Sequence, residues 1–370
     1  MGEVRPLEER DLPRLAEIHL SAIGHVGNTV EEVERGYIET VPELVLNRAY
    51  AEFASPSLVF EHDGIVQGFV LAGCQPAVFA GERVWVGSAG HLTVEPEARS
   101  SLAGIHLLRA LCDGPQDLLY IDRSNTQGRM ALKAAGFEQF PERSLRWSRV
   151  FSSAALQGQR VAQLFDLPWK PAMDGAARVG YWARRVARKP RFDLPDLPKA
   201  TSVVALTPEH VLEVAPKAMT RFDLHPEFSD ESQLTQSWDF MAKTRPNSTF
   251  VMHAVVNRRG TPVGWYIVDI DTHGFGDVVQ MVGVVGQERL VLLHLLHEAR
   301  RAGAVAVEGD LSLDMLFDVD DFDCEISAER TAKSVHSRDP KLVDAFRSGR
   351  AFLTQLEGEF LLWPPASVPR

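Results

Sequence analysis

The second half of the sequence repeats the turn residues of the first half at a nearly constant spacing. Gly64 recurs 196 residues later as Gly260, and each follows an apolar run and precedes another, which is typical of a β-hairpin. Asp122 recurs 188 residues later as Asp310, so a shorter loop in the second copy explains the change of spacing. The repeat predicts two domains of one fold in tandem, and 370 residues are enough for two domains that each bury a core.

Residues 90–109 predict a strand that passes through a short polar turn directly into a helix. The helix carries Leu108 and Leu111 on one apolar stripe together with Ile105 and Cys112, so this face is expected to pack inward. Its first turn, 99–104, has small side chains where the free N–H groups and the positive end of the helix dipole coincide. This corner is therefore a candidate site for a diphosphate.

The chain before this corner predicts helices over about 11–22 and 29–50, a hairpin over 58–73 and a loop over 74–83, followed by a strand over 84–94. The polar residues of the two helices form either a place for a substrate or a solvated helix face. These residues are His25, Asn28, Glu31, Glu32 and Glu39.

The order of residues from this corner onward resembles the GNAT acyltransferases. The matching residues are Leu92, Val94, Pro96, Arg99 and Gly104, followed by the strand 117–122, Asn125 and Gly136-Phe137. The resemblance spans most of residues 3–150 and implies an α/β fold with two GNAT-like domains in tandem. Each domain would be a mixed, mostly antiparallel sheet flanked by helices.

In that family the strand-to-helix turn binds acyl-coenzyme A. The resemblance implies that the strand end pairs with the pantetheine arm and that the turn holds the pyrophosphate of acetyl-CoA or another acyl-CoA. The residues implied are Leu92, Thr93, Val94, Arg99, Ser100, Ser101, Leu102, Ala103, Gly104 and Asn125. Leu102 stands where the family usually has a glycine.

The family's usual acid and base positions hold no such group in this sequence. The tyrosine that often follows the asparagine by seven residues is replaced by Leu132, and the strand positions that often hold Glu or His are Ser88 and Gly90. His91 is the adjacent candidate catalytic residue, although strand alternation directs it to the other face unless a bulge intervenes. A hydrogen-bonded structural histidine is the alternative.

The expected division of the chain is an acyl-CoA-binding domain at 1–150, a Pro- and Arg-rich linker at 151–200 and a second domain at 201–370. Within the linker, 178–191 has six basic residues and no acid. This predicts either a surface for an acidic partner, an acyl carrier protein or a membrane interface, or a solvated inter-domain helix. The second domain is expected to be degenerate, because Glu288 stands where a phosphate would be repelled.

Composition limits the remaining classes. A net charge of −11 argues against a nucleic-acid binder, and no window has the roughly 20 apolar residues of a membrane span. The charged first residues do not form a signal peptide, and the three cysteines are far apart, so a cytoplasmic protein with reduced thiols is expected.

No metal site is expected either. His294 and His297 have the wrong order for a zinc protease motif and are interpreted as helix-surface residues, and 310–323 is interpreted as a solvated acidic loop rather than a calcium loop.

The sequence therefore predicts a transferase that moves an acyl group from acyl-CoA to the amine of a small molecule. Catalysis would depend on proximity and on backbone polarisation of the thioester. Two alternatives stay open: an acyl carrier protein as the donor, and a non-catalytic protein that binds acyl-CoA or another metabolite.

Overall fold

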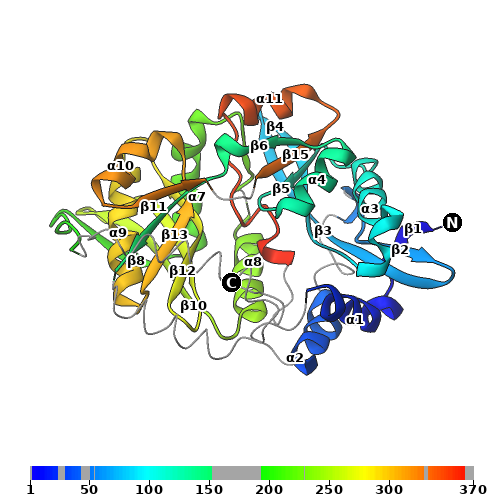
Figure 1. Cartoon of the computed structure of the whole chain (residues 1–370). Coiled ribbons are helices and arrows are strands. Elements are labelled where there is room, and N and C mark those ends of the chain that lie inside the picture. Colours follow the sequence, from blue (N-terminus) through cyan, green and yellow to red (C-terminus); the bar gives the residue numbers. More distant parts are fainter. Residues whose placement is uncertain are drawn as a thin grey trace.

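The chain forms two β-sheets that lie side by side, with helices packed on their faces (Figure 1). The computed structural model describes residues 2–23, 30–42, 51–53, 55–151, 193–228, 230–328 and 332–362. Both sheets are mixed and mostly antiparallel, which confirms the predicted fold class.

The first sheet is built mainly from the first half of the chain. Its only parallel neighbours in the described chain are β4 and β5, and the short strand β9, Leu224–Pro226, pairs with β3 outside the main order. In spatial order its strands are β1 Glu3–Pro6, β2 Leu58–His62, β3 Ile65–Phe79, β4 Glu82–Val94, β5 Leu118–Ile121, β15 Lys333–Ser337 and β6 Glu138–Phe140.

The second sheet repeats this plan with the second half of the chain. β12 and β13 are its parallel pair, at the position that β4 and β5 hold in the first sheet. In spatial order its strands are β14 Glu325–Ala328, β7 Leu145–Val150, β13 Ala306–Asp310, β12 Phe275–Gly283, β11 Pro262–Ile270, β10 Thr249–Asn257 and β8 Thr201–Ala205.

The two sheets exchange one strand each. β15, from the second half of the chain, lies between β5 and β6, and β7, from the first half, lies between β13 and β14. Each sheet therefore contains residues from both sides of the division predicted at residue 150. The boundaries themselves stay a prediction, and most of the expected linker, including its basic segment, lies outside the described residues.

Helices cover both faces of the first sheet. α1 and the following helical turns pack on the face that carries Leu71, and α3 packs on the opposite face with Ala72 and Ala89. The helices of this half are α1 Leu12–Ala22, α2 Val30–Arg35, α3 Ala103–Cys112 and α4 Thr126–Ala135. Those of the second half are α7 Pro208–Ala218, α8 Glu231–Thr244, α9 Glu288–Arg301, α10 Leu316–Asp321 and α11 Pro340–Ser348.

The hairpin repeat read from the sequence is present in both halves. Gly64 and Gly260 have φ of 77° and 78° at the turns of the two hairpins, a conformation that glycine adopts without strain. The loop predicted over 74–83 is wrong, because β3 runs to Phe79 and pairs continuously with β4 across a turn at Ala80 and Gly81. Of the second helix expected over 29–50, the described part, 30–42, is helical: α2 ends at Arg35 and a wider helical turn, Gly36–Thr40, follows it.

The C-terminal segment 351–362 lies between the two sheets, where Figure 1 shows it in red. The Tyr120 hydroxyl at the end of the first sheet donates to the Leu353 carbonyl at 3.2 Å. The Gln355 amide donates to Asp277 of the second sheet at 2.9 Å. This segment therefore contacts the parallel strand pair of each half.

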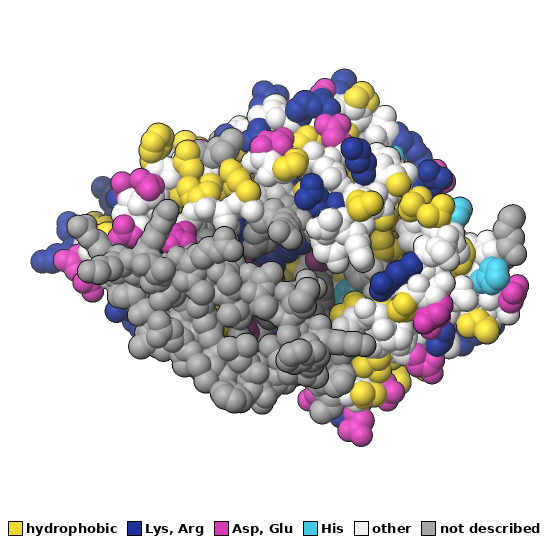
Figure 2. All heavy atoms as spheres, viewed as in Figure 1, with side chains coloured by type: hydrophobic (Ala, Val, Ile, Leu, Met, Phe, Trp, Pro, Cys, Tyr) yellow, Lys and Arg dark blue, Asp and Glu magenta, His cyan; other side chains and the backbone are white. Residues whose placement is uncertain are grey.

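The outer surface carries charges of both signs. Figure 2 shows Lys and Arg side chains along the upper edge of one face, where α11 lies. Arg347 of α11 pairs with Glu138, and Arg350 just beyond the helix pairs with Asp223. Both cations are therefore neutralised by neighbouring acids.

Candidate active site

The parallel pairing of β4 with β5 stops well before β4 ends. The last matched pair is Ser88 with Tyr120, while β4 continues to Val94 and β5 ends at Ile121. Residues 89–94 pair with β3 on one side and, within the described chain, with no strand on the other. An edge of this kind is suited to pair with an extended ligand that carries amides.

A tight corner follows the end of β4. A 3₁₀ turn, Pro96–Ser101, leads to Leu102, whose φ of 60° turns the chain into α3. The N–H groups of Ile105 and His106 donate to the Leu102 carbonyl, which leaves those of Ala103 and Gly104 at the open end of the helix. The predicted phosphate corner is therefore present as a helix N-terminus beside the unpaired edge of β4.

The side chains at this corner leave it accessible. Leu102 is 56% exposed, so its side chain does not enter the core. Arg99 and Ser100 are exposed, and no described acid pairs with Arg99. The Ser101 hydroxyl donates to the Ala98 carbonyl at 2.6 Å, which stabilises the turn.

The other residues implied by the family pattern lie close to this corner. Leu92 and Val94 pack beneath Gly104, where an added Cβ would lie 3.7 Å from each of their side chains. Thr93 is buried and donates to the His91 carbonyl at 3.1 Å. Asn125 caps α4 by accepting from the Gly128 N–H at 2.8 Å, and its contact with a cofactor stays a prediction.

His91 lies on a β-bulge, which the alternation of the strand could not show. The register between β3 and β4 shifts between Phe69 and Leu71, and His91 adopts φ of 54°. The bulge directs His91 toward α1, where its ring stacks on His19 with centroids 6.0 Å apart. Nδ1 of His19 lies 3.0 Å from the Tyr37 hydroxyl. His19 and Tyr37 were not singled out from the sequence, because only the packing of α1 brings them here.

Burial keeps these two imidazoles neutral at pH 7. It lowers the pKa of His91 to about 3, with smaller contributions from His19 and the Arg245 guanidinium, and it lowers the pKa of His19 to about 4. A base with such a low pKa accepts a proton poorly at neutral pH. The catalytic role predicted for His91 stays a prediction, and this low pKa does not favour proton transfer by its ring at neutral pH.

This arrangement predicts a loss of stability in acid. Below pH 6.5 the unfolded chain binds protons at these histidines while the folded chain does not. Each histidine therefore lowers the free energy of unfolding by about 1.4 kcal/mol for each unit by which the pH falls. Changing His91 to Asn, which tolerates positive φ, should remove about 2 kcal/mol of the stability difference between pH 6.5 and pH 5. Urea denaturation at the two pH values measures this, and an unchanged difference would contradict the assignment.

The second half has a similar diverging strand pair, but its corner is acidic. β12 pairs with β13 only over Phe275 to Asp277. Glu288 begins α9 and forms an ion pair with Arg221 at 2.6 Å, and Arg221 also contacts Asp314 at 2.8 Å. The prediction that an acid occupies this helix start is confirmed.

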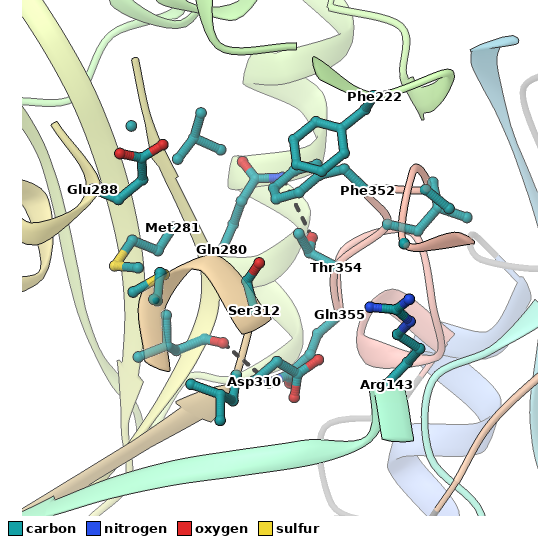
Figure 3. A pocket seen from close by; sticks show the side chains of 18 of the residues that line it. Arg143, Phe222, Gln280, Met281, Glu288, Asp310, Ser312, Phe352, Thr354 and Gln355 are labelled. Atoms are coloured by element: carbon teal, nitrogen blue, oxygen red, sulfur yellow. Dashed lines mark hydrogen bonds between the residues drawn. The ribbon is translucent and has the colours of Figure 1, made fainter. Parts of the chain in front are cut away.

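A cavity of about 150 Å³ lies beside this second strand pair. Figure 3 shows Phe222 and Phe352 at one side of it, with Glu288 at the far end. The Gln280 amide lies 3.4 Å from the Thr354 hydroxyl, so the C-terminal segment closes part of the gap. The cavity is lined by apolar side chains together with charged ones, among them Glu288, Asp310 and Lys333.

Two sequence interpretations are corrected here. His294 is a buried residue rather than a surface one, and its Nε2 lies 2.9 Å from the Thr201 hydroxyl. The acidic stretch 310–323 is not a solvated loop, because it contains α10 and its carboxylates meet Lys333, Arg221 and Arg289.

The described residues contain no cluster of three His, Cys, Asp or Glu side chains that could hold a metal ion. Within the same residues, no helix has the length and apolar character needed to cross a membrane. Cys74, Cys112 and Cys324 are all free thiols.

No protein-family model and no curated protein matches this sequence, but solved structures share its fold. A GCN5-related N-acetyltransferase from Anabaena variabilis matches 92% of this chain and 74% of its own, with a TM-score of 0.56 and 11% identity. A tandem GNAT protein from the clavulanic acid biosynthesis pathway matches 92% of this chain and 99% of its own, with a TM-score of 0.51 and 13% identity.

A third match is N-myristoyltransferase from Saccharomyces cerevisiae, solved with bound myristoyl-CoA. It covers 90% of this chain and 78% of its own, with a TM-score of 0.50 and 12% identity. At these identities the likeness establishes the fold, which is that of two GNAT domains in tandem.

Proposed function

We propose that this protein transfers an acyl group from acetyl-CoA or another acyl-CoA to the amine of a small molecule. The observation that carries the proposal is the end of β4–β5 pairing at Ser88 and Tyr120, after which β4 runs on to Val94 and leads into the corner 99–104. The unpaired edge suits the amides of a pantetheine arm, and the helix start with Arg99 suits its diphosphate.

The same geometry would also lower the barrier of the transfer reaction. A thioester held along 89–94 would have its carbonyl next to the bulge at His91, where main-chain N–H groups can stabilise the oxyanion. Fixing the thioester and the amine in one place lowers the entropic part of the barrier. The acceptor would approach from the face covered by α1, because the bulged residue points there.

A carrier-protein donor stays an alternative. The basic segment 178–191, which suggested it, lies outside the described residues. A non-catalytic binding protein would keep the corner but would show no turnover, so an activity assay separates it from the proposed enzyme.

Titration calorimetry with acetyl-CoA tests the corner directly. Ser100 is exposed and no described residue hydrogen-bonds its side chain, so Ser100→Glu adds a negative charge with little other change. We expect about tenfold weaker acetyl-CoA binding, because the new carboxylate repels the diphosphate, and the loss should shrink with added salt.

Ser100→Gln is the matched control, since it has the same size without the charge and should bind like the wild type. Absence of heat with the wild type, or equal affinity of the two variants, would contradict the proposed corner. Transfer is then measured as thiol release with a panel of primary amines: tyramine, spermidine and L-lysine.

A further inference from the structure

Glu359 occupies the space above Gly90 on the central strand of the candidate site. A Cβ added to Gly90 would lie 2.9 Å from Cβ and 3.3 Å from Oε2 of Glu359. Any larger residue at position 90 would displace Glu359, so glycine is required here by this close approach. Position 90 is also one of the two strand positions where a base was expected from the family pattern and none was found.

The carboxylate lies on the face that an acceptor would approach. Gly90 is paired directly with Leu71, so the two positions share one face of the sheet. Leu71 packs in the cluster formed with α1, the helix that also brings His19 to the bulge at His91. Glu359 is only partly buried.

Both halves of the chain hold Glu359 in place. Its N–H donates to Oδ1 of Asp122, at the end of β5, at 2.8 Å. The next residue, Phe360, lies under the Arg245 guanidinium of the second half at 4.0 Å. Glu357 in the same segment accepts from the Thr354 N–H at 2.7 Å, which fixes the turn that precedes Glu359.

We propose that Glu359 is the catalytic residue that binds the ammonium group of the acceptor and takes its proton. This proposal rests on the acyl transfer proposed above. It also assigns the acceptor to the primary amines that are cationic at neutral pH, because a carboxylate recognises a cation at this position.

The proton and bond changes balance without a further reactant. The ammonium group gives one proton to the Glu359 carboxylate, and the neutral nitrogen attacks the thioester carbon. A C–N bond forms while the C–S bond breaks, and the second proton of the nitrogen passes through water to the departing thiolate. Glu359 then returns its proton to solvent.

Glu359→Gln tests the role, because it keeps the size of the side chain and removes its basicity. With the amine panel and acetyl-CoA, we expect kcat to fall by about 100-fold or more, while calorimetry shows an unchanged Kd for acetyl-CoA. The acidic limb of the pH dependence of kcat/KM should also disappear. Asp122, Glu357 and Arg245, which contact this segment, all remain in the variant.

Glu138→Gln is the matched control, since this acid lies on the surface beside Arg347, and it should leave kcat and the pH profile unchanged. Unaltered thermal unfolding would show that Glu359→Gln is folded. In a second variant, Glu359→Gly combined with Gly90→Glu moves the carboxylate to the strand, and recovery of activity there supports the role independently.

The outcomes separate the two proposals. If the wild type binds no acetyl-CoA, or binds it and transfers to no amine in the panel, the transfer itself is wrong and the role of Glu359 falls with it. If the wild type transfers and Glu359→Gln keeps its kcat and its acidic limb, acyl transfer stands and only the assignment of Glu359 is overturned.

Discussion

Replacing Asp277 by alanine is expected to destabilise the protein by about 3–5 kcal/mol. The Asp277 carboxylate is 7% exposed and lies between two guanidinium groups, 2.9 Å from Arg123 and 2.7 Å from Arg146. It also accepts from the Gln355 amide at 2.9 Å. Removing it leaves buried cations with fewer partners, and uncompensated buried charge is costly.

The position of Asp277 makes this loss global. Arg123 follows β5 of the first sheet, Arg146 lies on the exchanged strand β7, and Gln355 belongs to the C-terminal segment, so the carboxylate joins three separate parts of the chain. Arg146 keeps Glu308 and Asp310 at 3.2 Å each, whereas Arg123 loses its direct ion pair. The two halves of the chain are therefore expected to unfold together.

Equilibrium urea denaturation followed by circular dichroism measures the change. Asp277→Asn, which keeps the shape and one acceptor oxygen, should be less destabilising than Asp277→Ala. Arg347→Ala, which removes an exposed ion pair with Glu138, should have little effect. A loss for Asp277→Ala no larger than that of Arg347→Ala would mean that water screens the cluster.

Local patterns predicted the parts of the fold that depend on local chemistry. The turn at Gly64 and its repeat at Gly260 were predicted because both positions need positive φ. The corner at 99–104 was predicted because a strand followed by small residues and an apolar helix stripe has few other solutions.

The strand exchange was not predictable from these patterns. The compositions of β7 and β15 would suit either sheet. Alternation of apolar and polar residues determines which face of a sheet a residue occupies, but not which of the two sheets the strand joins. The loop expected over 74–83 failed for a related reason. Pairing with β4 maintains the strand through this segment, so tertiary contacts override local propensity.

The candidate site also has one part that local patterns could predict and one part that they could not. Its main-chain part could be predicted, because it is contiguous in sequence from Leu92 to Gly104. Its side-chain part could not, because His91 turns on a bulge that a histidine does not signal, and Glu359 arrives from the far end of the chain. The only local indication of Glu359 was the glycine at position 90, where the family often has a base.

Replacing Trp147 by alanine is expected to cost about 3–5 kcal/mol and to loosen the second sheet, although Trp147 belongs to the first half of the sequence. Its side chain is 1% exposed and lies on β7 opposite Gly309 of β13 and Ile326 of β14. A Cβ on Gly309 would lie 2.9 Å from the indole ring, so the strands are fitted to this ring and would lose their contact when it is removed.

Hydrogen exchange detected by mass spectrometry checks where the loss falls. Protection should decrease in Ala306–Asp310 and Glu325–Ala328, the two strands that flank β7. Trp85→Ala is the matched control: this tryptophan lies on β4, is partly exposed and stacks on Phe53 at 3.9 Å, so its removal should cost less and leave those strands protected.

Because β15 ties the second half to the first sheet in the same way, denaturation of the Trp147 variant should remain a single transition for both halves. Two separate transitions, or full protection of β13, would mean that the exchanged strands do not couple the sheets.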